Sequence, residues 1–228
     1  MIISVHIPKT AGISFREELT KVFGERVLWD DGDWPESDTS EARANNDRRR
    51  AQMLAAADVY SARYDAIHGH FTARKYLGVF PVTEMVTWVR DPFQHAVSTY
   101  EHAVRDAQIA HPAHRAFKEQ QMTAVDLIEA IPNHQSLYLA GIPLDEFAMV
   151  GLTERYEQSV ALFETFFGIA VPHPRERLNV NPSRQSAEYE IPPAVRKAVE
   201  RYRAEDLEMY RRATERFDTQ CAAYGIDG

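Results

Sequence analysis

MIISVHIPKTAGISFREELTKVF, residues 1–23, begins with a short apolar segment and ends with a helical pattern. Ile2 to His6 is rich in β-branched residues, and the loop-forming residues Pro8 and Gly12 follow it at once. Ser14 to Phe23 then carries apolar residues at helical spacing. This order predicts a buried strand, a tight loop and a helix, which together form the first unit of an α/β domain.

The rest of the chain repeats this alternation. Further strands are expected from apolar segments at residues 64–68, 85–89 and 147–152. Helical patterns cover residues 41–57, 92–105, 154–167 and 192–223. We therefore expect a single α/β domain over residues 1–228, a P-loop NTPase-like three-layer sandwich with a central parallel sheet and helices on both faces.

The composition excludes several classes of protein. The chain has 26 Lys and Arg against 34 Asp and Glu, a formal net charge of −8, which argues against nucleic acid as the main partner. No stretch has the ~20 apolar residues that a membrane helix requires, so no membrane partner is expected. The chain opens with neither a basic leader nor an apolar signal core, and the lone Cys221 cannot form an internal disulfide. These features predict a cytoplasmic protein.

The loop before the first helix has the composition of an anion site. Backbone N–H groups and the helix dipole favour a negative charge there, Gly12 allows close approach, and Lys9 adds a positive charge. It is not a Walker A sequence, because the lysine precedes the glycine. A sulfuryl group in transfer carries less charge than a phosphoryl group, so these donors could serve it without a metal ion. The predicted ligand-binding residues of the loop are Pro8, Lys9, Thr10, Ala11, Gly12, Ile13 and Ser14.

A second anion site is predicted around Arg90. This arginine follows the strand pattern at 85–89, at the edge where open parallel sheets bind ligands, and its guanidinium can donate two hydrogen bonds to a phosphate. Ser98 lies about two turns into the next helix and could reach the same oxygens. Asp91 and Pro92 alone would also suit an ordinary helix start, as N-cap and first helical residue. Two anion sites on successive strand ends, however, suit a nucleotide that is charged at both ends.

His68 and His70 lie at the end of the predicted strand at 64–68 and are the first residues to consider as a general base. Histidine has the unperturbed pKa nearest neutrality. Because residues two apart on a strand share a face, the pair could instead bind a metal, or could serve only the structure. Glu101 and His102 are reserve candidates for the base.

The motif HIPKTAGISF, residues 6–15, resembles the 5'-phosphosulfate loop of sulfotransferases that use 3'-phosphoadenosine 5'-phosphosulfate (PAPS). It is most similar to the carbohydrate branch of that family, which includes the uronyl 2-O-sulfotransferases. The resemblance implies that Lys9 contacts the bridging oxygen and the transferring sulfuryl group. Many members carry Thr where this chain has Ile13.

Later segments extend the resemblance. Arg90-Asp-Pro with Ser98 and Tyr100 is similar to the family's 3'-phosphate motif, although the family commonly has a second arginine at the position of His95. A Gly-His segment supplies the catalytic histidine in the 2-O branch, which implies His70 first and His68 second. Residues 178–184 resemble a late loop over the nucleotide, in which Arg184 would assist at the 3'-phosphate and Asn179 or Asn181 would contact nucleotide or acceptor.

The resemblance therefore implies a sulfotransferase that moves a sulfuryl group from PAPS to a hydroxyl or amine of a small-molecule or carbohydrate acceptor and releases PAP. Two alternatives stay open: a P-loop-type kinase, which would need magnesium and a metal-binding acid such as Asp91, and a non-catalytic nucleotide-binding protein with a degenerate site. Residues 30–50 and 111–121 are the loops expected to choose the acceptor. Within the first of them, the run Arg48 to Arg50 is expected to be a solvated helix face.

Overall fold

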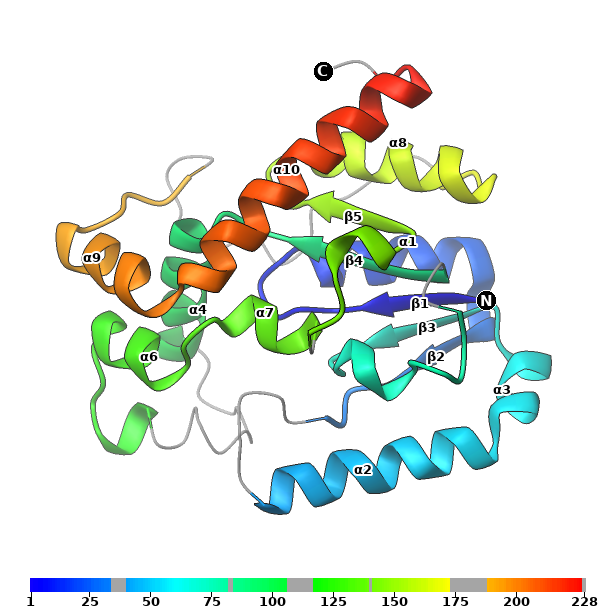
Figure 1. Ribbon diagram of the computed structural model, residues 1–228, viewed down its shortest axis with the longest axis horizontal. Coiled ribbons are helices and arrows are strands. Elements are labelled where there is room, and N and C mark those ends of the chain that lie inside the picture. Colours follow the sequence, from blue (N-terminus) through cyan, green and yellow to red (C-terminus); the bar gives the residue numbers. More distant parts are fainter. Residues whose placement is uncertain (34–39, 82–83, 106–116, 140, 173–187, 227–228) are drawn as a thin grey trace.

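The computed structural model describes residues 1–33, 40–81, 84–105, 117–139, 141–172 and 188–226 (Figure 1). Within these ranges a five-stranded sheet has the order β2-β3-β1-β4-β5, and each neighbouring pair of strands is parallel. The strands are β1 (Ile2–Val5), β2 (Val27–Trp29), β3 (Ala66–Gly69), β4 (Met85–Val89) and β5 (Met149–Leu152). The predicted α/β class with a central parallel sheet is confirmed.

The apolar strand sequences reflect burial on both faces. Every residue of β1, β3, β4 and β5 is buried, so these strands show no alternation of apolar and polar residues. β3 and β5 begin two residues later than the predicted segments at 64–68 and 147–152. β2 was not predicted, because three apolar residues do not stand out from the acidic, turn-rich sequence around them.

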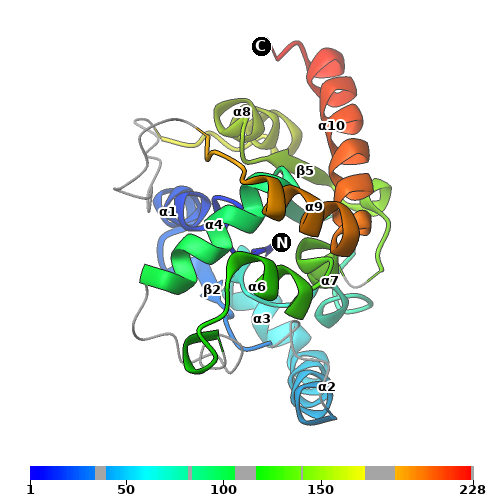
Figure 2. The ribbon, with the colours of Figure 1, turned by 90° about the vertical axis from the view of Figure 1, so that its left-hand side faces the viewer.

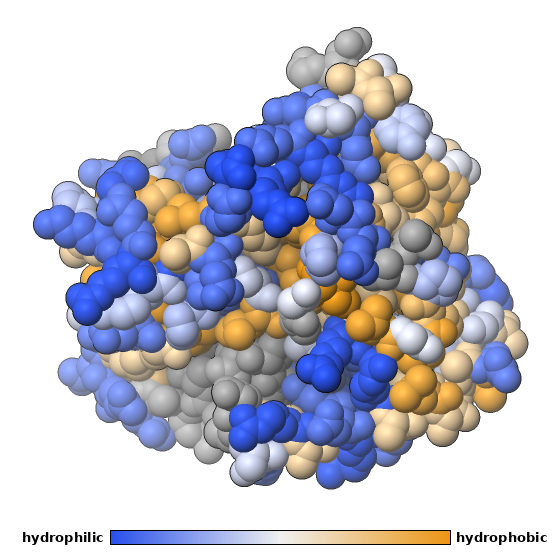
Figure 3. Space-filling view, viewed as in Figure 1, coloured by the Kyte–Doolittle hydropathy of each residue, from blue (hydrophilic) through white to orange (hydrophobic). Residues whose placement is uncertain are grey.

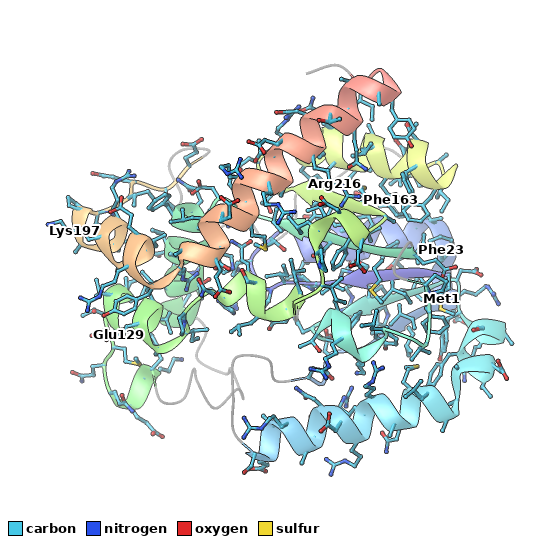
Figure 4. The ribbon with its side chains drawn as sticks, in the orientation of Figure 1. Met1, Phe23, Glu129, Phe163, Lys197 and Arg216 are labelled. Carbon is cyan, nitrogen blue, oxygen red and sulfur yellow. The ribbon has the colours of Figure 1, made fainter. Side chains whose placement is uncertain are left out.

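Helices cover both faces of the sheet, as expected (Figure 2). α1 (Gly12–Phe23) and α8 (Tyr156–Phe167) lie on one face, where the rings of Phe15 and Phe163 pack edge to face, 5.1 Å apart. α7 (His134–Leu139) and α10 (Ala204–Tyr224) lie on the other face. Arg216 extends from α10 and donates hydrogen bonds to the carbonyls of Phe147 and Ala148, just before β5 (Figure 4).

A group of helices lies beyond the carboxyl ends of the strands. It consists of α4 (Pro92–Arg105), α6 (Ala124–Ala130) and α9 (Pro193–Tyr202), which pack around Ala96, Ile128 and Val199. Glu129 and Lys197 lie on the outer side of this group, away from the sheet (Figure 4). α4 starts as predicted, because Asp91 Oδ1 accepts hydrogen bonds from the N–H groups of Phe93 and Gln94.

The predicted helix over 192–223 is divided. α9 ends and α10 begins at Arg203, whose φ of −128° and ψ of 37° lie outside the helical range. Further helices are α2 (Ser40–Ala55), α3 (Ala57–Arg63) and the short 3₁₀ turns η1 (Gly24–Arg26), η2 (Ala73–Lys75) and η4 (Leu144–Glu146). Among the described residues, no helix combines the length and the apolarity that crossing a membrane requires.

Candidate functional site

The predicted site residues converge at the carboxyl ends of the central strands. β1 lies between β3 and β4, so the chain crosses from one side of β1 to the other when it passes from β3 to β4. In open parallel sheets, ligands bind at such a switch point. The loop after β1, the histidines at the end of β3 and the arginine after β4 therefore share one region of the molecule.

The loop between β1 and α1 has the backbone of an anion-binding concavity. Lys9 and Ala11 have φ angles of 67° and 68°, which are uncommon for residues other than glycine, whereas Thr10 between them has a negative φ. Such alternation turns successive N–H groups toward one point. Within the described part of the chain, no acceptor contacts the N–H groups of Lys9, Thr10 or Ala11. The first N–H groups of α1, which have no intrahelical acceptor, add to these donors.

Four carbonyl oxygens of the same loop, those of residues 6–9, are each bound by a side-chain donor. The pairs of acceptor and donor are His6 O with His70 Nδ1 (2.8 Å), Ile7 O with Thr10 Oγ1 (2.8 Å), Pro8 O with His95 Nε2 (2.9 Å) and Lys9 O with Arg90 Nη1 (3.1 Å). A carbonyl oxygen beside an anion repels it, so holding these oxygens on donors keeps the N–H face of the loop available. The loop is thus held by residues that directly follow β3 and β4, by one residue of α4 and by its own Thr10.

Glycine is required at position 12 because another ring occupies the space of its side chain. A Cβ at Gly12 would lie 1.8 Å from Cδ2 of His6. The His6 ring is buried and stacks on His70 at 4.1 Å and on His68 at 5.0 Å. Burial, together with His70 and His68, lowers the pKa of His6 well below its ordinary value, so His6 is neutral at physiological pH.

Positive charges gather beside the loop of this acidic protein. Burial, and then the charges of Arg105 and Arg90, lower the pKa of Lys9 from 10.5 to about 8. Cations held this close repel one another unless an anion joins them. Lys9, Arg90 and Arg105 therefore supply the local basic environment that the net charge of −8 hides.

Arg90 is fixed by its backbone and by its guanidinium. Gln135 of α7 accepts from the Arg90 N–H at 2.9 Å and donates to the Arg90 carbonyl at 2.8 Å. The side chain is 11% exposed, its Nε lies 3.9 Å from Glu154 Oε1, and its guanidinium faces the ring of Tyr189 at 5.7 Å. Burial raises the pKa of Glu154. Neither Gln135 nor Glu154 was predicted from the sequence to be a site residue.

The predicted hydroxyl donors differ in their environments and in their bonding. Thr10 directs its proton to the Ile7 carbonyl, inside the loop. Ser14 in α1 and Ser98 in α4 are both buried, whereas Ile13 is exposed. Arg184, and with it Asn179 and Asn181, lies outside the described residues.

The two candidate histidine bases occupy different environments. His68 is 2% exposed, its Nδ1 lies 2.8 Å from Ser4 Oγ, and burial followed by the charges of His70 and Arg16 lowers its pKa to about 3. His70 is half-buried, and its Nδ1 must carry a proton because it bonds to the carbonyl of His6. The neutral ring then keeps its basic lone pair on Nε2, which favours His70 over His68 as the base. The reserve candidates Glu101 and His102 lie on α4.

An acidic segment after β2 holds the His70 segment in place. Asp31 Oδ1 accepts from the His70 N–H at 2.8 Å, and Asp30 N–H donates to the His68 carbonyl at 3.0 Å. The approach is so close that a Cβ at Gly69, whose φ is 158°, would lie 2.1 Å from the Asp30 carbonyl oxygen. Glycine is therefore needed at position 69 because the Asp30 backbone passes so close to it.

The same segment carries a buried ion-pair network that the sequence did not predict. Lys75 Nζ lies 2.5 Å from Asp30 Oδ2 and 3.1 Å from Asp33 Oδ1, and Arg49 Nη2 lies 2.6 Å from Asp30 Oδ1. Arg50 donates to the carbonyls of residues 75 and 77. The prediction of a solvated face at 48–50 was therefore wrong for Arg49 and Arg50, because both guanidinium groups reach inward to oxygens of distant segments.

A separate cavity lies beside α10. It has a volume of about 460 Å³ and is lined by residues of α7, of 141–144 and of α10, including Leu139, Ile142 and Met209. Hydrophobic residues are visible beside the middle of α10 in Figure 3. Lys9, His70 and Arg90 do not line this cavity, so it is distinct from the site at the strand ends.

Comparison with solved structures shows the fold. The crystal structure of a sulfotransferase from Alicyclobacillus acidocaldarius matches with a TM-score of 0.51 and 14% sequence identity, covering 93% of this chain and 95% of that one. The crystal structure of mouse sulfotransferase SULT7A1 complexed with PAP matches with a TM-score of 0.40 and 14% identity, covering 100% of this chain and 85% of that one, a similarity too low to support a conclusion. No protein-family model and no curated protein matches the sequence.

Proposed function

We propose that the protein transfers a sulfuryl group from PAPS to a hydroxyl or amine of a carbohydrate or small-molecule acceptor and releases PAP. The observation that carries this proposal is the hydrogen bond from Arg90 Nη1 to the Lys9 carbonyl, which joins the two predicted anion sites. A ligand with an anionic group at each end can therefore contact both. The likeness of the 6–15 motif to the phosphosulfate loop supports the same ligand.

The residues present fit such a ligand. Among the described residues, the loop offers free N–H groups, because the neighbouring carbonyls are held by other donors. Burial and the charges of two arginines lower the pKa of Lys9 to about 8. We assign Lys9 and the backbone of residues 10–14 to the 5'-phosphosulfate, and Arg90 and Ser98 to the 3'-phosphate. Arg184 is proposed as a further contact to the 3'-phosphate.

PAPS, when bound, would supply the sulfuryl group, and PAP would be the leaving group. His70 Nε2 takes the proton of the acceptor hydroxyl as the new oxygen–sulfur bond forms and the bond between sulfur and the phosphate oxygen breaks. Lys9 stabilises the negative charge that develops on that phosphate oxygen. The Nδ1 hydrogen bond of His70 to the His6 carbonyl orients the ring and stabilises the imidazolium. A uronyl hydroxyl is the acceptor that the likeness to the 2-O branch favours.

The kinase alternative needs an acid for magnesium. Asp91, the acid next to Arg90, already accepts two backbone N–H groups through Oδ1 as the N-cap of α4. That use competes with metal binding. A non-catalytic nucleotide-binding protein remains the second alternative, and Ile13 and His95, which differ from the common family residues, are the features that favour it.

Calorimetry with PAP, ADP and ATP, each with magnesium and with EDTA, tests the proposal. PAP should bind about tenfold or more tightly than ADP and independently of magnesium, because the 3'-phosphate adds charge-assisted hydrogen bonds. Lys9→Ala should weaken PAP binding, whereas Lys197→Ala, on the outer side of α9, should not. Equal affinities for PAP and ADP, or a requirement for magnesium, would overturn it. If the wild-type protein transfers sulfate to no acceptor tested, so that Lys9→Ala and His70→Ala have no activity to reduce, the non-catalytic alternative is supported.

A further inference from the structure

A buried arginine and a buried aspartate lie at the junction of α9 and α10. Arg203 and Asp206 are both 0% exposed. Within the described residues, Nε and Nη2 of Arg203 have no hydrogen-bond partner. A guanidinium placed in this way is costly, and an apolar side chain of similar volume would often stabilise the fold as well or better. The contacts that these residues do make lead to the candidate site.

One chain of hydrogen bonds runs from Arg203 to the anion loop. Nη1 of Arg203 lies 2.9 Å from His95 Nδ1, and His95 Nε2 lies 2.9 Å from the Pro8 carbonyl oxygen. Arginine only donates, so Nδ1 of His95 is the acceptor and Nε2 carries the proton. Burial, followed by the charges of His134 and Arg203, lowers the pKa of His95 well below its ordinary value. His95 is therefore a neutral ring whose tautomer is set by Arg203.

A second chain runs from Asp206 to Arg90. The Asp206 carboxylate accepts from the N–H of Gln135 at 3.2 Å and from the N–H and hydroxyl of Ser136 at 2.8 and 2.7 Å. These bonds hold the first turn of α7. The amide of Gln135 in turn forms hydrogen bonds with both the N–H and the carbonyl of Arg90.

We propose that Arg203 and Asp206 are positioning residues for the anion site, Arg203 acting through His95 on the Pro8 carbonyl and Asp206 acting through Gln135 on the Arg90 backbone. The two chains start within one turn of α10 and end on the two halves of the site. Without the donor on Nδ1, the His95 proton is free to move from Nε2, and the Pro8 carbonyl loses the partner that holds it away from the N–H face. The proposal rests on the proposed function only for the identity of the ligand.

The ligand-free protein gives the first test. Arg203→Met should shift the ¹⁵N resonances of the His95 ring and the amide resonances of Lys9, Thr10 and Ala11. Arg201→Met should not, because Arg201 is exposed and stacks on Tyr202. In His95→Gln the side-chain amide can donate to the Pro8 carbonyl whether or not Arg203 is present. Arg203→Met should therefore shift the loop amides much less in that background. If R203M does not fold, Arg203→Lys takes its place in both backgrounds. Unchanged loop amides in the folded variant overturn the proposal.

Binding of PAP gives the second test. R203M should weaken PAP about three- to tenfold, the loss expected when one hydrogen bond no longer positions a group. Asp206→Asn should do the same and should shift the Arg90 amide, with Glu205→Gln as its control. If the wild type does not bind PAP but R203M shifts the loop amides, the proposed ligand is wrong and the positioning role stands. If PAP binds equally to wild type, R203M and D206N, the positioning role is wrong and the ligand stands.

Discussion

Arg90 donates a hydrogen bond from Nη1 to the backbone carbonyl of Lys9 over 3.1 Å, although the two residues lie 81 positions apart. The bond places the guanidinium at the end of β4 on the loop that follows β1. Burial lowers the pKa of Lys9, and the charges of Arg105 and Arg90 lower it further. An anion that contacts either side chain is therefore close to the other.

Arg90→Met should weaken PAP binding ~10- to 100-fold, because a hydrogen bond to a charged group contributes about 1.5–3 kcal/mol. Arg90→Lys should recover only part of the affinity, since an ammonium lacks the rigid fork of donors. Titration calorimetry measures both. Arg211→Met, on the exposed side of α10, is the control. An R90M variant that binds as tightly as the wild type would contradict a shared anion site.

PAP affinity should fall as pH rises through about 8. Lys9 in the free protein has a pKa of about 8, and a bound anion raises it, so binding takes up a proton above that pH. The contribution of Lys9 is complete below pH 8 and is lost as the pH approaches the pKa of the bound form. Lys9→Arg does not titrate in this range, so its affinity should stay level between pH 7 and 9. A parallel decline in wild type and K9R would show that another group is responsible.

His70→Asn should slow transfer strongly while PAP still binds. The asparagine amide can donate to the His6 carbonyl in place of Nδ1, but it offers no basic nitrogen. Loss of a general base lowers the rate about 10²- to 10⁴-fold. Transfer of radioactive sulfate from PAPS to carbohydrate acceptors, with calorimetry on the same preparations, separates the two effects. Retained activity in H70N would exclude His70 as the base.

Gly12→Ala should lower both stability and PAP affinity. Its Cβ would lie 1.8 Å from the His6 ring, and overpacking of this kind costs about 1–3 kcal/mol. Gly24→Ala is the matched control, because Gly24 has a φ of 56° but no atom near its missing Cβ. That variant should lose about 1–3 kcal/mol of stability from backbone strain alone and bind PAP normally. Urea unfolding and calorimetry distinguish the two glycines.

Lys75→Met should destabilise the fold by roughly 3–5 kcal/mol, because it removes the buried cation of two buried carboxylates and leaves them, within the described residues, only Arg49, whose side chain is partly exposed. Lys75 lies against Asp30 and Asp33, all three of them buried. Arg212→Met removes an exposed pair with Asp145 and should cost at most about 1 kcal/mol. Urea denaturation measures both free energies of unfolding. A small loss in K75M would show that the network contributes little to stability.

Acid should weaken the same network at Asp30. Burial opposes ionisation of Asp30, but Lys75, Tyr76 and Arg49 outweigh it and lower the pKa of Asp30 below 3.8. A depressed pKa stabilises the fold above the unfolded value, and this contribution is lost as pH falls through the folded value. Burial raises the pKa of Asp33, so its contribution has the opposite sign. Unfolding of Asp30→Asn should therefore depend less on pH below 4 than unfolding of the wild type.

Local patterns were sufficient for most of the fold. Met85 to Val89 is apolar throughout and forms β4 with the predicted bounds, and Asp91 caps α4 as its sequence indicates. These features depend on residues within a few positions of one another. β2 was missed because its pairing with β3, and not its own short sequence, makes it a strand.

For the site, the sequence by itself determined which groups could bind an anion: a lysine-bearing loop before a helix, an arginine at a strand end and a histidine pair. Only the tertiary structure decided how they are used. Asp31, Gln135 and Arg203 come from distant elements, and their hydrogen bonds fix His70, Arg90 and His95 respectively. Tautomers and lowered pKa values arise from burial and from neighbours that folding brings together, and no local sequence pattern encodes such neighbours.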